Sequence, residues 1–533
     1  MPIYKTNKGI LYFAHIPKSG GMVIEAYLST RFGVPAFLDP PYSKNNNTWN
    51  NTSPQHIDAK SLARLFPEGF FDISFAVVRH PVDRLVSAYR WQKYQYKSIA
   101  DEMDFSSWLR SVAEDIQKQS SVLDNHLRYQ TDLIPPKSKI FKLEDGLDKV
   151  IDFLNEKFGR PDQDIPLDNK NQLPSGETIV PCKDDILLIE TLYAWDYFYL
   201  GYPRTINHIA EHCHNRTPDQ ITFALKLPCP TVDVQWRWGD FHLATGLANA
   251  LQRHGYQTRL DAEENWDAHR QANDIDIVIR GKVPYLKRPG NPCIFWFISN
   301  PDNTNWRELV AADHVFVASQ PLSKKVAKKI GAEKVTLLPQ AFDTDRILEP
   351  TFNIRNKKPL FVGIAREFER PCIQYALALD LDIDLIGRLW DNKPASKYVI
   401  QQYIDNKELG NLYHQYKIVL NDHMPHMRNE GMLSNRVFDA LACASIVVSD
   451  AVTWLPDDIK PMVYIYTDMD SFKDAIAKAT AEDDHMFRKR IEFAKAMRNV
   501  HSFDNRADTI LRVLKLPAQS FGKSTNKPDN SAC

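Results

Sequence analysis

The sequence contains little cysteine and no long apolar run, and these two absences exclude several classes of protein. Its 533 residues include only 7 cysteines, an odd number without the paired spacing of a disulfide framework or a zinc site. No stretch reaches the roughly 18 apolar residues of a membrane-spanning helix, and no secretory signal precedes the first charged loop. We therefore expect reduced cysteines, no integral membrane segment and a cytoplasmic protein.

Excess charge of one sign is absent as well. Lys+Arg of 66 against Asp+Glu of 67 leave a formal net charge of −1, so no global field draws the chain to nucleic acid. We also expect no metal site. The histidines of residues 204–222 lack acidic partners at metal-binding spacing. His423 and His426 flank Pro425, which interrupts the helix that a metal-binding pair would need.

The stretch LYFAHIPKSGG (residues 11–21) is an apolar strand followed by a glycine-containing turn and a helical pattern. Backbone N–H groups and the dipole at a helix N-terminus favour an anion, and glycines leave room for it. A Walker A loop places its lysine after the glycines and follows it with a magnesium-binding Ser or Thr; this turn does neither, which argues against an ATPase or kinase. It therefore predicts a metal-free phosphate site formed by Lys18, Ser19, Gly20, Gly21 and Met22.

A second strand, turn and helix lies in FFDISFAVVRHPVDRLVSAYRW (residues 70–91). Arg79 stands at the carboxyl end of the strand, where ligands of parallel sheets bind. Pro81 suits the first position of the helix, and Ser87 lies about two turns further on. An arginine fork beside a hydroxyl predicts a second phosphate site.

Between these motifs and after them, helical patterns fill residues 100–130 and 144–158, whereas polar stretches at 35–55 and 160–177 predict loops. Four aromatic residues near Ser87 either stack on adenine or a sugar or pack in the core. They are Tyr89, Trp91, Tyr94 and Tyr96.

These motifs resemble those of carbohydrate sulfotransferases of the heparan and chondroitin type, which use 3′-phosphoadenosine 5′-phosphosulfate (PAPS) as donor. HIPKSGG is similar to the family's 5′-phosphosulfate loop, and VVRHPVDRLVSAY is similar to its 3′-phosphate motif. The resemblance covers roughly residues 8–203 and implies an α/β, P-loop-like domain with a central parallel sheet. Met22 and Val23 stand where the family carries Thr-Ser, so the backbone must hold more of the 5′-phosphate. Further similar segments are SPQH (53–56), NHLRYQ (125–130) and YAWDY (193–197).

The resemblance also implies a mechanism without a metal. His56 is the expected general base for an acceptor sugar hydroxyl. If His126 is the base instead, His56 becomes an acceptor contact. Lys18 and the backbone of residues 19–22 stabilise charge at the 5′-phosphate, while the arginine and serine of the second motif hold the 3′-phosphate. Because the fold starts near Met1, without the membrane anchor of eukaryotic relatives, we expect a cytosolic bacterial enzyme.

After residue 221 the chain shows near-continuous apolar strands that alternate with helical stretches, and this series occurs twice. The pattern is typical of parallel sheets and predicts two consecutive Rossmann-like domains with a ligand cleft between them. We expect five segments: a first domain at 1–203, a connector at 204–221, two Rossmann-like domains at 222–345 and 346–515, and a disordered tail at 516–533.

This second part resembles glycosyltransferases of the GT-B fold, in particular the CgeB-like proteins within glycosyl transferases group 1. LSNRVFDALACASIVVSD (433–450) is similar to the family's SNR-x-FDALACG-x-VISD. The usual Glu-x7-Glu signature is absent, since Glu430 and Asp439 are nine residues apart, and Ala444 replaces a glycine. The resemblance implies a nucleotide-sugar donor held by Arg366 and Arg370 at the diphosphate, by Ser434, Asn435 and Arg436 near the nucleotide-sugar, and by Asp439 at the ribose.

We therefore expect a bifunctional enzyme that acts on a glycan. One part transfers a sulfuryl group from PAPS to a sugar hydroxyl, and the other transfers a sugar from a nucleotide-sugar to a glycan acceptor. The main alternative is a sulfotransferase fused to a non-catalytic, glycan-binding GT-B module. Two further alternatives are a scaffold protein made of two inactive nucleotide-binding folds and a nucleotide kinase.

Overall fold

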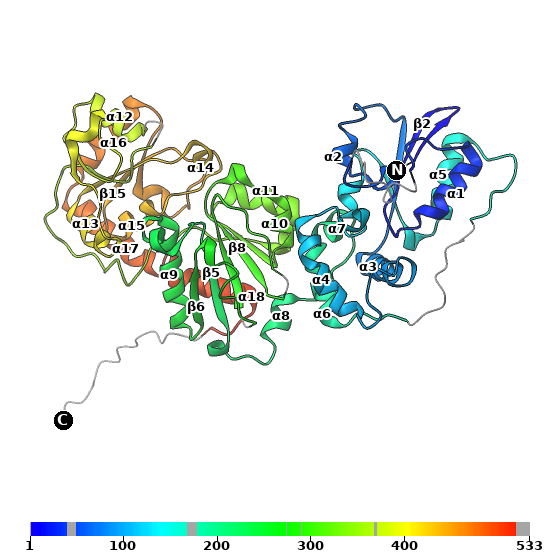
Figure 1. Ribbon diagram of the computed structural model, residues 1–533. Coiled ribbons are helices and arrows are strands. Elements are labelled where there is room, and N and C mark those ends of the chain that lie inside the picture. Colours follow the sequence, from blue (N-terminus) through cyan, green and yellow to red (C-terminus); the bar gives the residue numbers. More distant parts are fainter. Residues whose placement is uncertain are drawn as a thin grey trace. The chain divides into compact units, whose positions relative to one another are not determined.

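The computed structural model describes residues 2–39, 50–167, 178–272, 274–288, 290–366 and 370–518. The contacts divide the chain into two units, residues 1–206 and 207–533 (Figure 1). The described residues form three sheets, in which all neighbouring strands run parallel except β1 and β2. The predicted α/β class is confirmed.

The first unit is built on a four-stranded sheet of order β1-β2-β3-β4. Strands β2, β3 and β4 are parallel, and β1 is an antiparallel edge. Two of these strands are followed by the helices that the sequence predicts, α1 after β2 and α3 after β3. The strands are β1 (Ile3–Thr6), β2 (Gly9–Ala14), β3 (Ile73–Val78) and β4 (Lys139–Lys142). The helices are α1 (Gly21–Phe32), α2 (Ala59–Leu62), α3 (Pro81–Arg90), α4 (Phe105–Lys118), α5 (Asp148–Phe158), α6 (Lys183–Leu192) and α7 (Ala194–Tyr199).

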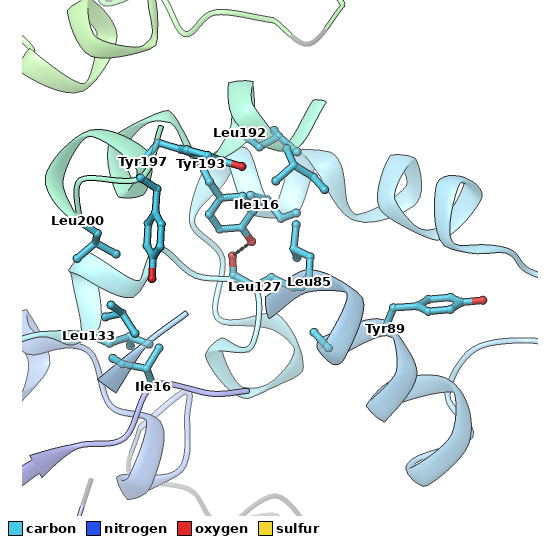
Figure 2. Close-up of a cluster of buried hydrophobic side chains, with 14 of the residues drawn as sticks. Ile16, Leu85, Tyr89, Ile116, Leu127, Leu133, Leu192, Tyr193, Tyr197 and Leu200 are labelled. Atoms are coloured by element: carbon cyan, nitrogen blue, oxygen red, sulfur yellow. Dashed lines mark hydrogen bonds between the residues drawn. The ribbon is translucent and has the colours of Figure 1, made fainter. Parts of the chain in front are cut away.

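Alternate residues of the strands face two separate cores. Helices α1 and α5 supply the core on one face, and α3, α4, α6 and α7 supply the core on the other. Figure 2 shows the second core, where the hydroxyl of Tyr193 donates to the backbone oxygen of Leu127 at 2.5 Å. This bond ties the junction of α6 and α7 to the segment that contains His126.

The helix predicted over residues 100–130 is wrong beyond α4, and the chain there turns left-handed. Leu123, Asp124 and Asn125 have φ angles of 51°, 55° and 62°. Short polar side chains such as Asp and Asn compete with helical hydrogen bonds by bonding elsewhere, and here both side chains bond to residues 53–56. The predicted loops at 35–55 and 160–177 fall partly on residues 40–49 and 168–177, outside the described residues.

The second unit contains two six-stranded parallel sheets, of order β10-β9-β8-β7-β5-β6 and β13-β12-β11-β14-β15-β16. These are the two Rossmann-like sheets that the alternating pattern predicts. The strands of the first are β5 (Thr222–Lys226), β6 (Gln257–Asp261), β7 (Asp274–Arg280), β8 (Cys293–Phe297), β9 (His314–Val317) and β10 (Val335–Leu337). Those of the second are β11 (Leu360–Val362), β12 (Asp384–Ile386), β13 (Val399–Gln401), β14 (Ile418–Asn421), β15 (Ile446–Asp450) and β16 (Val463–Tyr466).

The last helix of the chain returns to the first of these two sheets. Helix α18 packs against α9, as Figure 1 shows. Gly246 in α9 permits this approach, because a Cβ there would lie 2.4 Å from the ring of Phe503. Residues 519–533 of the predicted tail lie outside the described residues. The helices of this unit are α8 (His208–Cys213), α9 (Gly239–Arg253), α10 (Trp306–Ala311), α11 (Gln320–Ile330), α12 (Pro371–Ala378), α13 (Leu409–Gln415), α14 (Pro425–Asn429), α15 (Asn435–Ala442), α16 (Met469–Ala481), α17 (Asp484–Val500) and α18 (Phe503–Leu514).

Candidate functional site

The turn between β2 and α1 is shaped by two glycines. Gly20 caps α1 with a φ of 80°, and within the described part of the chain no side chain caps this N-terminus with a hydrogen bond. Gly21 lies against His15, so that a Cβ at this position would come within 2.0 Å of the imidazole Nε2. The hydroxyl of Ser19 turns inward, 3.4 Å from Oε1 of Gln130. The backbone of the turn is therefore accessible to an anion, and only glycine fits at residue 21.

A cavity of about 630 Å³ gathers the predicted residues of the first unit from four distant segments of the chain. The side chain of Ser19 points away from it. Of the four aromatic residues near Ser87, Trp91 and Tyr96 line the cavity, Tyr89 is buried in the core and Tyr94 is exposed. The predicted residues along the cavity are Lys18, Gly20, Gly21, Met22, His56, Arg79, Ser87 and His126.

Two buried side chains that sequence reasoning missed hold these segments together. The amide of Gln130 accepts from the N–H of Arg79 at 2.9 Å and donates to its backbone oxygen at 2.8 Å. Arg84 donates to the backbone oxygens of Pro17 at 3.1 Å and His126 at 2.9 Å. The guanidinium of Arg84 thus joins the phosphate loop, 67 residues before it in sequence, to the histidine segment, 42 residues after it.

The cavity carries positive charge at the loop. Burial, assisted by the charge of Arg79, lowers the pKa of Lys18 to about 8. The ammonium lies 3.7 Å from the centre of the Trp91 ring, a cation–π contact. A bound anion would relieve the repulsion between these two cations and stabilise the charged form of Lys18.

Three histidine rings stand in a row along the cavity. The centroid of His56 lies 5.0 Å from that of His15 and 5.3 Å from that of His126. Burial lowers the pKa of His56 to about 4 although Asp124 raises it, so this ring is neutral at pH 7. Burial, together with the repulsion that a protonated His56 and the Lys18 ammonium would exert, holds the pKa of His126 well below its usual value.

Of the three rings, His15 and His56 each bond a carboxylate. Nδ1 of His56 donates to Asp124 at 2.7 Å, which leaves Nε2 as its proton-accepting nitrogen. Nδ1 of His15 lies 2.6 Å from Glu25. Nδ1 of His126 is buried without a hydrogen bond to the part of the chain that the structure describes.

Asp124 is itself held in place by strained backbone and by Ser53. The N–H and hydroxyl of Ser53 donate to its two carboxylate oxygens at 2.7 and 2.6 Å. Burial raises the pKa of Asp124, but His56 and Ser53 outweigh it and leave the pKa below its ordinary value. Left-handed backbone at a non-glycine residue costs energy and persists only where surrounding contacts enforce it. The sequence pattern gave no signal for this pairing.

In the second unit, three arginines cluster near the carboxylate of Asp422. Arg370 is ion-paired with Asp422. Arg436 donates to the side-chain oxygen of Asn421 at 2.6 Å and to the backbone oxygen of Val362. Burial and the charges of Arg370 and Arg436 lower the pKa of Arg366 to about 10. Among the residues that the structure describes, Asp422 is the carboxylate that these three arginines face.

The other predicted residues of this region bond mainly within the protein. The hydroxyl of Ser434 donates to Asn421 at 2.8 Å. Asp439 is buried; its two oxygens accept from Arg346 at 2.7 Å and from Asn435 at 3.1 Å. The predicted contact of Asp439 with a ribose stays a prediction, and Arg346 is a neighbour that sequence reasoning missed.

The isolated histidines and cysteines have structural surroundings. His423 is buried, with Nδ1 2.6 Å from Asp450 and Nε2 accepting from the N–H of Ser434. Within the described ranges, no group of three or more His, Cys, Asp or Glu side chains is arranged to hold a metal, and six cysteines are free. None of the helices described is both long enough and apolar enough to cross a membrane.

Comparison with known proteins matches two parts of the chain to protein families. Residues 3–203 match the sulfotransferase family, and residues 366–512 match the family described as glycosyl transferase-like. The first unit is therefore a sulfotransferase-family domain, and the last part of the second is glycosyltransferase-like, as the two resemblances predicted. A search of curated proteins gives no match.

Similar solved structures share low sequence identity with this chain. AviGT4, a glycosyltransferase involved in avilamycin A biosynthesis, is 14% identical with a TM-score of 0.41, over 55% of this chain and 97% of its own. T4 phage BGT with its UDP-glucose substrate is 11% identical with a TM-score of 0.37, over 55% and 99%. Anabaena Alr3699/HepE with UDP-glucose has the same identity, score and coverage.

Proposed function

We propose that the first unit transfers a sulfuryl group from PAPS to a sugar hydroxyl, and that the second transfers a sugar from a nucleotide-sugar to a glycan. The observation that carries the first proposal is the cavity of about 630 Å³, which joins Lys18, Arg79 and His56 from three segments. Cations, a helix N-terminus and a neutral histidine are what transfer from an anionic donor to a hydroxyl requires.

Donor binding divides between the two motifs. Arg79 and Ser87 would hold the 3′-phosphate, which distinguishes PAPS from ATP. Lys18 and the N-terminus of α1 would hold the 5′-phosphosulfate. Met22 offers no hydroxyl, so the backbone and Lys18 carry more of this interaction. Trp91 and Tyr96 are placed on the cavity wall for an adenine or a sugar ring.

Transfer then needs a base beside the acceptor. Nε2 of His56 takes the proton from the hydroxyl as its oxygen bonds to sulfur. The bond from sulfur to the bridging oxygen of the 5′-phosphate breaks, and Lys18 stabilises the charge that collects there. Asp124 would stabilise the imidazolium of His56, whereas no carboxylate of the described residues bonds to the ring of His126. This difference supports His56 as the base and His126 as an acceptor contact.

The second activity is supported by the arginine cluster. Arg366, Arg370 and Arg436, which within the described residues share the carboxylate of Asp422, would neutralise a diphosphate leaving group without a metal. The engaged carboxylate of Asp439 and the engaged hydroxyl of Ser434 favour the alternative, a glycan-binding module without transfer. The two readings differ in whether a nucleoside diphosphate binds.

Calorimetric titration with 3′-phosphoadenosine 5′-phosphate, ADP, UDP, GDP and CDP tests both proposals. We expect the bisphosphate to bind and Arg79→Ala to abolish its binding, while one other diphosphate binds through Arg366. If ADP binds as well as the bisphosphate, the 3′-phosphate site does not exist and the sulfotransferase proposal fails. If only the bisphosphate binds, the second unit is a binding module. Magnesium-dependent phosphate transfer from ATP would replace both proposals with a kinase.

A further inference from the structure

A second, larger cavity lies within residues 207–533, between the two Rossmann-like sheets. Its volume is about 800 Å³, within the range of sites that enclose small ligands. Its walls come from three places: the segment after β5, the segment that joins the two sheets, and the segment after β13. The first and third follow the carboxyl ends of parallel strands, where ligands of such sheets bind.

Two exposed aromatic rings from different sheets meet at this cavity. Trp236 follows β5 and is 39% exposed, and Tyr403 follows β13 and is 41% exposed. Their centroids lie 5.3 Å apart with the rings at 86°. His242 holds the backbone here, because its Nε2 donates to the backbone oxygen of Trp236 at 2.9 Å. Large aromatic faces held in place on an open wall are suited to the apolar face of a sugar ring.

A buried donor at the same cavity has no acceptor among the residues that the structure describes. Arg346 lines the cavity, and its side chain is only 9% exposed. Its Nη2 donates to Asp439, whereas Nη1 makes no hydrogen bond to the residues that the structure describes. An unpaired buried donor is costly, so a ligand oxygen beside it would be stabilising.

The charges along the wall nearly balance and suit an uncharged ligand. Asp343, Asp345 and Asp405 line the cavity with Arg346 and Lys407. The charge of Arg346 is neutralised by Asp439, which is buried behind it. Burial holds the pKa of His242 below its usual value, so this ring is uncharged at pH 7. Asp345 is ion-paired with Arg253 at 2.8 Å, and the guanidinium of Arg237 lies 4.9 Å from the centre of the Trp236 ring. Asp343 and Asp405 are therefore balanced by Lys407 and Arg237, and amides supply the other polar contacts (Asn249, Asn406 and Asn411).

We infer that this cavity binds an uncharged, unsulfated stretch of glycan, with Trp236 and Tyr403 packed on a sugar ring and Arg346 donating to a sugar oxygen. The cavity differs from the arginine cluster around Asp422, whose positive charge suits the diphosphate of a donor. As an acceptor site it rests on the proposed glycosyl transfer. Because the described residues of the wall hold no excess of cations to stabilise a sulfate, and Asp343 and Asp405 would repel it, glycosyl transfer would precede sulfation of the same stretch of glycan.

A glycan array tests the inference with the full-length chain. The array would carry neutral oligosaccharides of glucose, mannose, galactose and N-acetylhexosamine beside their sulfated counterparts. We expect binding to at least one neutral chain and weaker binding to its sulfated partner. Trp236→Ala should lower that affinity about tenfold, as loss of an aromatic anchor does, whereas Trp236→Phe should retain most of it. Calorimetry with the best neutral chain would give the affinities.

A second set of variants tests how the carboxylates of the cavity affect binding of sulfated glycan. Asp405→Asn keeps the oxygen that accepts from the N–H of Lys407 but removes the charge. Combined with Asp345→Asn, it should raise affinity for the sulfated partner about fivefold and leave neutral binding nearly unchanged. His56→Asn in the first unit serves as control, because glycan bound in the sulfotransferase cavity would respond to it and not to Trp236→Ala.

Three results would overturn the inference: no binding to any neutral chain, neutral binding that survives both Trp236→Ala and Tyr403→Ala, or sulfated chains that bind at least as well through Trp236. The proposed glycosyl transfer is judged apart from this, by diphosphate binding at Arg366. If neutral glycan binds through Trp236 but no diphosphate binds, the glycan site is supported and the proposed glycosyl transfer is contradicted. If a diphosphate binds but no glycan does, the proposed glycosyl transfer keeps its support and the glycan site is contradicted.

Discussion

The two predicted donor sites use their polar side chains in opposite ways. In the first unit, Lys18, Arg79 and Ser87 line one cavity, and buried residues behind them bond to the backbone. In the second, Ser434 and Asp439 bond to neighbours inside the protein, and positive charge is concentrated on arginines. A motif match identifies a strand, turn and helix; the partners of each side chain determine which atoms face a ligand.

The largest expected effect is the loss of the base in the first unit. His56→Ala should lower the rate of sulfuryl transfer about 10²–10⁴-fold, the usual contribution of a general base. His126→Ala should lower it about tenfold, because it removes an acceptor contact. The measurement is transfer of labelled sulfate from PAPS, with binding of the bisphosphate as a control for folding. A larger loss in His126→Ala would reverse the assignment.

Lys18→Met should lower sulfuryl transfer about 10²–10³-fold, since Lys18 stabilises charge that develops only during transfer. Affinity for 3′-phosphoadenosine 5′-phosphate should fall much less. Lys8→Met, an exposed lysine between β1 and β2, is the matched control and should change neither value. Equal losses of rate and affinity would show that Lys18 only binds the donor.

Arg84→Met tests whether the first site depends on its buried support. The change leaves the backbone oxygens of Pro17 and His126 without a donor, which should cost about 2–4 kcal/mol of unfolding free energy. Differential scanning calorimetry should show a lower transition temperature for residues 1–206 and an unchanged transition temperature for residues 207–533. A shift of both transitions would mean that the two units unfold together.

The His56–Asp124 pair predicts a pH dependence of stability. The pKa of His56 is about 4 in the folded protein and ordinary when unfolded, so the unfolded chain binds the proton more readily between these values. The free energy of unfolding therefore includes a contribution from neutral His56 that is fully present above about pH 6.5 and is lost as the pH falls toward 4. About 2 kcal/mol of this contribution is lost by pH 5. Comparing wild type with His56→Gln at pH 7 and pH 5 isolates the effect. A wild type that loses no more stability than His56→Gln would contradict it.

Arg366→Ala carries the smallest expected effect and tests the second site. Affinity for the nucleoside diphosphate should fall about tenfold, as expected for one lost charge-assisted contact. The melting temperature should not change. Arg436→Ala should lower both, because Arg436 also bonds to Val362 and Asn421. Unchanged affinity in Arg366→Ala would separate the arginine cluster from any donor.

The local parts of the fold were predictable because they depend on neighbours in sequence. The strand before Lys18, the helix beginning at Pro81 and the alternating strands of the second unit follow from periodicity and turn residues. The short edge strand β1 and strand β4 were not predicted, since four residues carry too little pattern. The helix expected through residue 130 was wrong because bonds to residues 53–56 outweigh helical propensity there.

The sequence by itself determined the two nucleotide-type folds, the phosphate loop at Lys18 and the absence of a magnesium motif, since each is written in contiguous residues. Only the tertiary structure decided that Asp124 orients His56, that Arg84 joins the loop to His126, and that Trp236 meets Tyr403. Those partners are tens to more than a hundred residues apart, with no periodic signal between them. Pairing at such distances is set by how strands and helices pack, which no local pattern encodes.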